Sequence, residues 1–197
     1  MATTSAIGAV NVLLVNARGE VLLQRRREDK ENGGRWDKTV GGHVDEGETF
    51  DEAAVREAGE ELFGDGDSPR VRLARDEADL ARLLATADLS RQVVFRRVAL
   101  QLNLRDVRLV PGGAGIRNVV YHVASYLGRT DVPLDGFRPQ ADEIVGLRYA
   151  APAEVDALLV RGEPGARKTG VRGVRRPGWG GVTTARRPRG ATCRRAP

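Results

Sequence analysis

The sequence predicts an α/β (α+β) fold in which strands and helices mix along the chain and pack as a sandwich. Three observations support this class. An apolar, β-branched run lies close to the N-terminus, a capped amphipathic helix follows it, and further strand and helix patterns come after that helix. The chain shows no internal repeat. A single layered domain is therefore expected, and a repeat array is not.

The first elements are short strands joined by turns. Residues 7–15 are apolar and rich in β-branched side chains, 16–19 are typical of a turn, and 20–26 return to a strand pattern, which together predict a hairpin. Residues 28–35 are polar and are expected to form a loop. A short strand at 36–44 is then expected to enter a glycine loop.

The first helix is predicted over residues 49–62. Thr49 can cap it, because Glu52 follows three residues later as in a capping box. Its inward stripe is expected to be apolar and to face the core. That stripe consists of Phe50, Ala53, Ala54, Ala58 and Leu62.

The second half of the chain gives weaker patterns. We expect a helix at 76–87 and a final helix that begins at a proline and runs over 152–160. Apolar and β-branched segments between these helices predict four more strands. Those strands are expected at 92–98, 104–110, 118–127 and 143–149.

The chain divides into a domain at 1–161, with an insertion at about 65–117, and a basic tail at 162–197. Eleven basic residues and one acidic residue follow position 160, so the net charge of +5 divides into about +10 for this end and about −5 for the rest. The tail is dense in Gly, Pro and Arg and lacks apolar period, so it is expected to be disordered.

Composition excludes several classes of protein. The length of 197 residues suits one domain with a sizeable core. No apolar run reaches the length of a membrane span, and the N-terminus shows no secretory signal. Cys193 is the single cysteine, so an internal disulfide is impossible. A cytoplasmic location is the resulting expectation, without a membrane partner.

The stretch from Gly42 to Glu61 predicts chemistry. Glu57, Glu60 and Glu61 are spaced i, i+3 and i+4, so one face of the predicted helix carries all three carboxylates. Like charges at this spacing repel one another and weaken a helix unless a hard divalent cation gathers them. A metal site on this helix is therefore expected.

Polar residues around this stretch are candidates for substrate contacts. Basic residues precede it and could attract an anion, and of these Arg26 and Arg35 are the candidate substrate-binding residues. Trp36 is expected to lie in the core, and His43 to be a structural loop residue. The remaining basic residues of this cluster are Arg25, Arg27, Lys30 and Lys38.

The spacing resembles the signature of the Nudix hydrolases, G-x5-E-x7-R-E-U-x-E-E-x-G-U, where U is a bulky apolar residue. The resemblance covers residues 7–62 and, more loosely, 119–160. The chain departs from the signature at its end, where Phe63 holds the glycine position and Gly64 comes one residue late. The matching positions are Gly42, Glu48, Arg56, Glu57, Glu60 and Glu61.

This resemblance implies an α/β/α sandwich with a mixed central sheet and a role for each matching residue. Glu57, Glu60 and Glu61 would bind Mg²⁺ or Mn²⁺. Arg56 would hold the carboxylates in place, while Glu48 would pair with Arg56 or approach the metal through water. The glycines Gly41 and Gly42 would lie beside the substrate, where Gly42 allows a sharp backbone turn.

The implied reaction is hydrolysis of a small diphosphate substrate by a metal-activated water. The substrate would be a nucleoside diphosphate derivative or a related organic diphosphate. Which carboxylate takes the proton stays open between Glu57, Glu60 and a downstream acid, either Asp142 or Glu143. Dimers are common in the family, so a homodimer is one expected state. The insertion is expected to shape the pocket for the leaving group.

Two other functions are weighed against this one. The sequence at 21–26 and 36–44 resembles that of isopentenyl-diphosphate isomerase, a relative with the same fold. In that enzyme a catalytic cysteine occupies the position that Gly41 has in this chain. The basic tail could instead bind RNA or another polyanion, although it has no aromatic residue beyond Trp179. An altered reading frame would explain the tail equally well, so no function is assigned to it.

Overall fold

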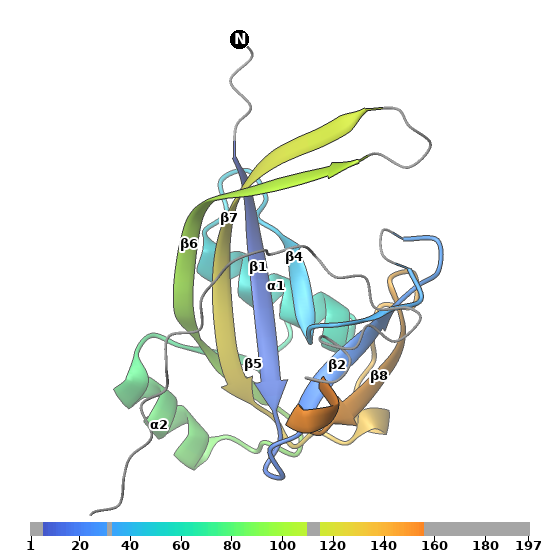
Figure 1. Ribbon diagram of the computed structural model, residues 1–197. Coiled ribbons are helices and arrows are strands. Elements are labelled where there is room, and N and C mark those ends of the chain that lie inside the picture. Colours follow the sequence, from blue (N-terminus) through green and yellow to red (C-terminus); the bar gives the residue numbers. More distant parts are fainter. Residues whose placement is uncertain (1–5, 31–32, 110–114, 156–197) are drawn as a thin grey trace, which may run out of the picture. The chain divides into compact units, whose positions relative to one another are not determined.

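The computed structural model describes residues 6–30, 33–109 and 115–155 (Figure 1). These residues form one eight-stranded mixed sheet with two α-helices and a short 3-10 helix, η1 (Leu134–Gly136). The mixed α/β class predicted from the sequence is confirmed. The predicted tail at 162–197 and residues 156–160 of the last predicted helix lie outside the described residues.

The sheet is built around its first strand, β1 (Ile7–Val15). This strand pairs parallel with β7 (Ile116–Arg129) on one side and antiparallel with β4 (Val40–His43) on the other. Next to β7 lies β6 (Val93–Leu109), which is antiparallel to it, and β5 (Val71–Ala74) pairs parallel with β6. The glycines of β4 thereby lie directly beside the centre of the sheet.

The strands expected as an N-terminal hairpin are both present, but they diverge. β2 (Val21–Arg26) meets β1 only at the pair Val15 and Val21. Its main partner is β8 (Ile144–Ala150), and it also pairs with the two-residue strand β3 (Trp36–Asp37). The expected hairpin was therefore wrong about pairing. The backbone of β1 is hydrogen-bonded mainly to β4 and β7, and that of β2 mainly to β8, so the two strands pair with each other only at the turn. The strand expected at 36–44 is likewise split into β3 and β4.

Helix α1 (Phe50–Phe63) has the capping predicted for it. The Thr49 hydroxyl accepts from the Glu52 amide, and the Glu52 carboxylate accepts from the Thr49 amide. The helix ends at Gly64, which adopts a left-handed φ of 71°. Its apolar stripe packs on the core side chains of β1, among them Val10 and Val12. The helical part of the Gly42–Glu61 stretch is thus packed against the sheet.

The middle of the chain departs from prediction. A single strand, β6, replaces the two expected at 92–98 and 104–110, and its register shifts between Arg97 and Ala99 and between Gln101 and Leu104. Such bulges break the alternation on which a sequence-based assignment depends. The sequence also gave no sign of the four-residue β5. Helix α2 (Glu77–Thr86) lies within the predicted range.

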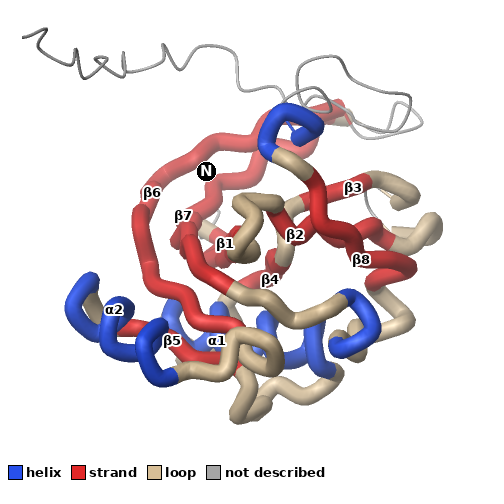
Figure 2. Tube along the Cα trace, turned by 90° about the horizontal axis from the view of Figure 1, so that it is seen from below, coloured by secondary structure: helices blue, strands red, loops and turns tan. Residues whose placement is uncertain are grey.

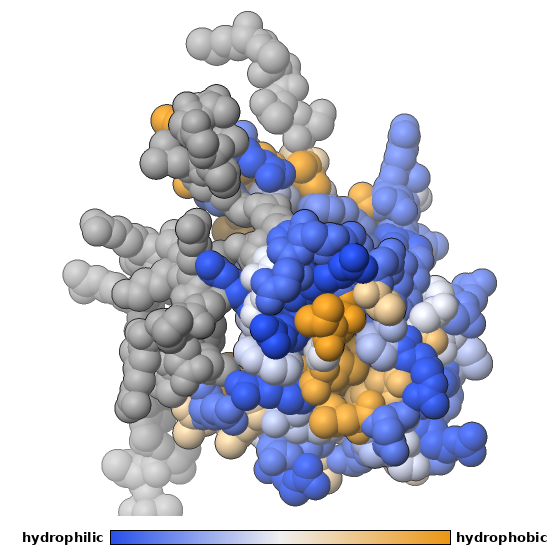
Figure 3. All heavy atoms as spheres, turned by 90° about the vertical axis from the view of Figure 1, so that its right-hand side faces the viewer, coloured by the Kyte–Doolittle hydropathy of each residue, from blue (hydrophilic) through white to orange (hydrophobic). Residues whose placement is uncertain are grey.

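The remaining face of the sheet has a smaller core around β2 and β8. Trp36 packs there beside Val21, Leu23 and Ala150, as expected for a core residue. One face of the molecule is mainly hydrophilic in its described part, around a small group of apolar side chains (Figure 3). Among the described helices none is long and apolar enough to cross a membrane.

Candidate active site

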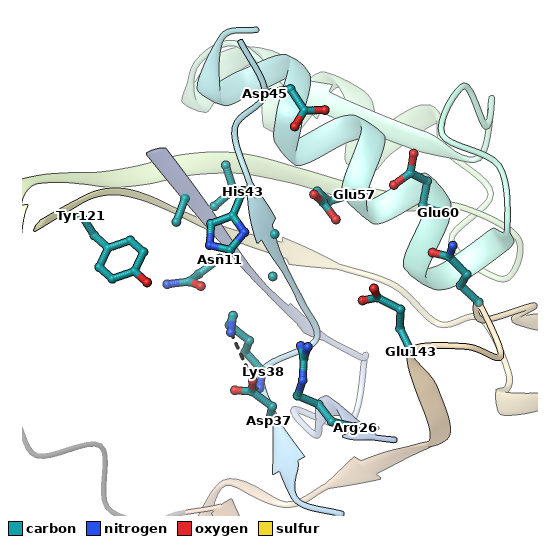
Figure 4. A pocket seen from close by; sticks show the side chains of 15 residues that line it. Asn11, Arg26, Asp37, Lys38, His43, Asp45, Glu57, Glu60, Tyr121 and Glu143 are labelled. Carbon is teal, nitrogen blue, oxygen red and sulfur yellow. Dashed lines mark hydrogen bonds and ion pairs between the residues drawn. The ribbon is translucent and has the colours of Figure 1, made fainter. Parts of the chain in front are cut away.

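A polar pocket of about 520 Å³ opens where β1, β4 and α1 meet the residues before β8 (Figure 4). Five carboxylates line it: Glu57 and Glu60 from α1, Glu143 from the segment before β8, Asp37 at the end of β3 and Asp45 just after β4. Two cations, Arg26 and Lys38, line it as well, and Figure 4 shows them apart from Glu57 and Glu60, with Asp37 beside Lys38. The pocket therefore has a negative wall and a positive wall.

Arg56 holds the carboxylates of the negative wall. Its Nε and Nη2 donate to the two oxygens of Glu48 at 2.9 and 3.0 Å, and its Nη1 reaches Glu57 at 3.0 Å and Glu60 at 3.2 Å. Nη2 also donates to the carbonyl of His43. The hydrogen bonds with Glu48 raise the pKa of Arg56 and lower the pKa of Glu48. Both groups therefore stay charged across the physiological range.

Glu57 lies partly buried against the glycine strand. Burial raises the pKa of its carboxyl, Arg56 opposes the shift, and the charges of Glu60 and Glu143 raise it further. A Cβ at position 42 would overlap the Glu57 carboxylate. Gly42 is consequently required by close approach, and the Glu57 side chain lies in the space that any other residue would fill.

Glu61 points away from the pocket. Its side chain is only 2% exposed, and its Oε2 accepts from the Gly41 amide at 3.0 Å and from Gln24 Nε2 at 3.3 Å. Burial raises the pKa of Glu61 to about 8, although the Gly41 hydrogen bond opposes the shift. Of the three carboxylates expected to bind one metal, Glu57 and Glu60 line the pocket. Glu61 does not, and it accepts a hydrogen bond from the backbone of β4 instead.

The donor set suits a hard divalent cation. No three acidic, histidine or cysteine side chains of the described residues lie in a compact metal-binding cluster. Glu57, Glu60 and Glu143 nevertheless line one pocket, and carboxylate oxygens are the ligands that Mg²⁺ and similar ions prefer. Burial, together with the charges of Glu60 and Glu143, raises the pKa of Glu57, and a bound cation would favour its charged form. The residues therefore fit such an ion.

The structure separates the remaining candidates. Arg26 lines the pocket, and its buried Nε has no hydrogen-bond partner among the described residues, whereas Arg35 is not among the lining residues. Glu143 lines the pocket and pairs with Lys30 at 3.2 Å. Asp142, the other downstream acid, is exposed and lies outside the lining.

Sequence reasoning missed several neutral lining residues. Asn11 interrupts an apolar strand, pairs in register with Gly41 and faces the pocket, so its polarity within β1 was the available signal. His43 was expected to be structural, yet it lines the pocket with its ring 6.4 Å from that of Tyr121 and inclined by 15° (Figure 4). Gln140 completes this group and had no local signal.

The family is shown by direct comparison. The NUDIX domain family model matches residues 6–170. An uncharacterized Nudix hydrolase, lmo0368 of Listeria monocytogenes serovar 1/2a (strain ATCC BAA-679 / EGD-e), is 41% identical over 54 residues, which make up 27% of this chain and 32% of that protein. The chain therefore belongs to the Nudix family, as the sequence predicted. The match to this relative spans only about a third of that protein's length.

A solved structure shows the same fold, and another is similar to this chain at a lower score. The crystal structure of DR0079 from Deinococcus radiodurans aligns with a TM-score of 0.52 at 22% identity and covers 80% of this chain and 74% of its own. A MutT protein from Methanosarcina mazei Go1 aligns with a TM-score of 0.45 at 17% identity, over 80% of this chain and 85% of its own. The closer likeness to isopentenyl-diphosphate isomerase is not confirmed by these relatives.

Proposed function

We propose that this protein hydrolyses the diphosphate linkage of a nucleoside diphosphate derivative with the help of Mg²⁺ or Mn²⁺. The observation that carries the proposal is the division of the pocket, in which Glu57 and Glu60 lie on one side and Arg26 and Lys38 on another, with Asp37 paired to Lys38. A diphosphate is a chain of anionic oxygens. It can contact the cationic wall directly and the acidic wall only through cations.

The cationic wall would bind the diphosphate. Arg26 has a buried donor, Nε, without a hydrogen-bond partner among the described residues. Lys38 Nζ forms an ion pair with Asp37 Oδ2 at 3.2 Å. Charge-assisted hydrogen bonds from such groups to phosphate oxygens are short and strong. The side chain of Lys38 packs over Gly41, so the glycine pair allows the cation to approach the centre of the pocket.

Glu57, Glu60 and Glu143 would hold the divalent ions, with Glu61 as a further candidate if its proton is lost. When bound, such ions neutralise charge on the bridging oxygens and acidify a water molecule. Arg56 keeps Glu57 and Glu60 in position through its two bonds at Nη1. A carboxylate left free of the ions could accept the proton of the attacking water, and Glu57, Glu60 and Glu143, which all line the pocket, are the candidates for this role.

The neutral end of the pocket would bind the nucleoside. The nearly parallel rings of His43 and Tyr121 offer an aromatic surface, and the Asn11 amide has no hydrogen-bond partner among the described residues. A planar base can stack on such rings while an amide reads its edge. An isoprenoid diphosphate would leave the amide unpaired, which favours the nucleoside.

The proposal is tested by measuring phosphate release from nucleoside and non-nucleoside diphosphates with Mg²⁺ and with Mn²⁺. We expect Glu57→Gln and Glu60→Gln each to lower kcat, and Glu46→Gln, which changes an exposed carboxylate of the same loop–helix segment, to have no effect. We expect Asn11→Ala to raise KM for the nucleoside substrates. Turnover that persists in the double variant Glu57→Gln/Glu60→Gln, or that needs no divalent ion, would show the proposal to be wrong.

A further inference from the structure

A second cavity of about 630 Å³ lies away from the active site, beside β5 and the end of α2. It shares no lining residue with the active-site pocket. Figure 2 shows α2 and β5 side by side, next to α1. Three arginines line this cavity: Arg70 just before β5, Arg72 within β5, and Arg91 just before β6.

Arg70 is fixed in place. Its Nε donates to the Arg91 carbonyl at 2.7 Å, its Nη1 donates to the Gly136 carbonyl at 3.2 Å, and its guanidinium lies 4.0 Å from the centre of the Phe63 ring. These contacts use two of its donor groups and leave Nη2 without a partner in the described part of the chain. A guanidinium held in this way loses little further freedom when it binds a ligand.

The positive charge of this cavity is only partly compensated. Neither Arg72 nor Arg91 has an ion-pair or side-chain hydrogen-bond partner among the described residues, and both are exposed. Burial lowers the pKa of Arg70, and the neighbouring charges of Arg91 and Arg138 lower it further. Asp88 is the one carboxylate among the described lining residues. Its Oδ1 accepts hydrogen bonds from the backbone amide and the hydroxyl of Ser90.

We propose that this cavity is a binding site for the phosphoryl group of a small molecule, separate from the active site. Arginines present planar pairs of donors that match phosphate oxygens, and charge-assisted bonds of this kind are strong. Arg70 supplies a donor held by its own contacts, and the exposed Arg72 and Arg91 supply further donors. The Gln92 side chain lines the same cavity and can add a neutral donor.

The site has a structural consequence. Arg70 connects β5 to the 3-10 helix through Gly136 and to the end of α1 through Phe63. A bound anion would neutralise the repulsion among Arg70, Arg91 and Arg138 and so stabilise the junction of these elements. Phosphate should therefore raise the unfolding temperature of the full chain even when divalent ions are removed.

The test uses the full-length protein in EDTA, with inorganic phosphate as the probe and constant ionic strength. Phosphate binding is measured by calorimetry and by the rise in Tm for the wild type and for the variant Arg72→Gln/Arg91→Gln. The matched control, Arg105→Gln/Arg129→Gln, removes the same charge from two exposed arginines elsewhere on the sheet. A second control, Arg26→Gln/Lys38→Gln, disables the cationic wall of the active site.

We expect Arg72→Gln/Arg91→Gln to weaken phosphate binding at least about tenfold and to abolish the rise in Tm. Both controls should retain the rise. The proposal is overturned if the Arg72→Gln/Arg91→Gln variant keeps the full effect, if the charge-matched control loses it equally, or if the active-site control alone removes it. A short single-stranded RNA that binds the same arginines at least about tenfold more tightly than phosphate would replace the small-molecule assignment.

Should the double variant fail to fold, the wild type still decides the question. The Nε–H proton of Arg70 is held in one hydrogen bond and is observable by NMR in arginine-labelled protein. Phosphate added in EDTA should shift this resonance with the same saturation as the calorimetric signal. An unchanged Arg70 resonance at saturating phosphate would overturn the proposal.

Discussion

At residue 56 a single guanidinium serves three carboxylates that would otherwise repel one another. Arg56 forms a two-point contact with Glu48 and single contacts with Glu57 and Glu60, and its side chain is 27% exposed. The planar fork of arginine makes this arrangement possible, because lysine offers a compact ammonium and no fixed pair of donors. The role of Arg56 is therefore geometric as well as electrostatic.

Replacing Arg56 by lysine tests this geometry. We expect Arg56→Lys to lower the free energy of unfolding by about 1–3 kcal/mol, since bonds to charged, partly buried groups are lost. Diphosphate hydrolysis should fall by about a hundredfold as Glu57 and Glu60 lose their positions. Urea unfolding and steady-state kinetics measure the two effects. Arg18→Lys, which changes a 74% exposed pair with Glu20, is the control and should be nearly neutral.

Glu61 gives the metal-free protein a distinctive pH dependence. Its folded-state pKa of about 8 lies above its ordinary value, so the folded state binds the proton more tightly than the unfolded state. The contribution of Glu61 to stability is thus fully present at low pH and is lost as the pH rises from about 4.5 to 8, with a slope of up to about 1.4 kcal/mol per pH unit.

The variant Glu61→Gln keeps the acceptor for the Gly41 amide and removes the titration. In EDTA, this variant should show a smaller decline in unfolding free energy between pH 5 and 8 than the wild type, since only the raised pKa of Glu57 remains. Chemical denaturation at pH 5, 6, 7 and 8 measures the difference. Glu46→Gln, which alters an exposed carboxylate, should retain the wild-type slope. Equal slopes for the wild type and Glu61→Gln would contradict the burial argument.

At the scale of elements, the sequence predicted what short-range interactions decide. Helix α1 follows from the capping box at Thr49 and the spacing of its alanines, so its bounds agreed with the pattern to within a residue. Gly64, which breaks the family signature, serves as the left-handed cap one residue after Phe63. Strand pairing could not be predicted in this way, because β2 joins β8 across more than a hundred residues.

The bulge in β6 illustrates the same limit. Asn103 has a φ of 58°, in the left-handed region, and its amide donates to His122 Nδ1 at 3.1 Å. Nothing in the residues around it marks a bulge within a long strand. The local pattern accordingly predicted two strands where tertiary pairing with β7 maintains one.

The conformation of Asn103 can be tested by substitution. A β-branched side chain is strained at positive φ, so Asn103→Val should lower the free energy of unfolding by about 1–2 kcal/mol, while Asn103→Gly should be neutral or slightly stabilising. Thermal and urea unfolding measure both. Asn118→Val, in the facing strand β7, is the control and should not destabilise. A neutral Asn103→Val would mean that residue 103 is not held in the left-handed region.

At the scale of the whole molecule, the pocket unites residues that no local pattern connects. The spacing within Gly42–Glu61 predicted that Glu57 and Glu60 share one face of a helix, and both line the pocket. Glu143 and Tyr121 reach the same pocket only because β7 lies against β1 and β8 lies against β2. The acidic residues of α1 were therefore predictable, while Glu143 and the neutral residues that bear on substrate choice depended on topology.

The division of charge along the chain separates the enzyme from the alternative of a polyanion-binding protein. The family match ends at residue 170, and residues 171–197 contain eight arginines and no acidic residue. A variant that ends at residue 170 should keep the kcat/KM of the full chain, because every residue of the proposed site lies before that point. Any RNA binding by the full chain should be salt-sensitive and should disappear in this variant, since arginine–phosphate contacts would supply it. Hydrolysis assays and RNA titrations at two salt concentrations measure both properties. Loss of hydrolysis in the shortened chain, with its fold intact by circular dichroism, would mean that the basic segment takes part in catalysis.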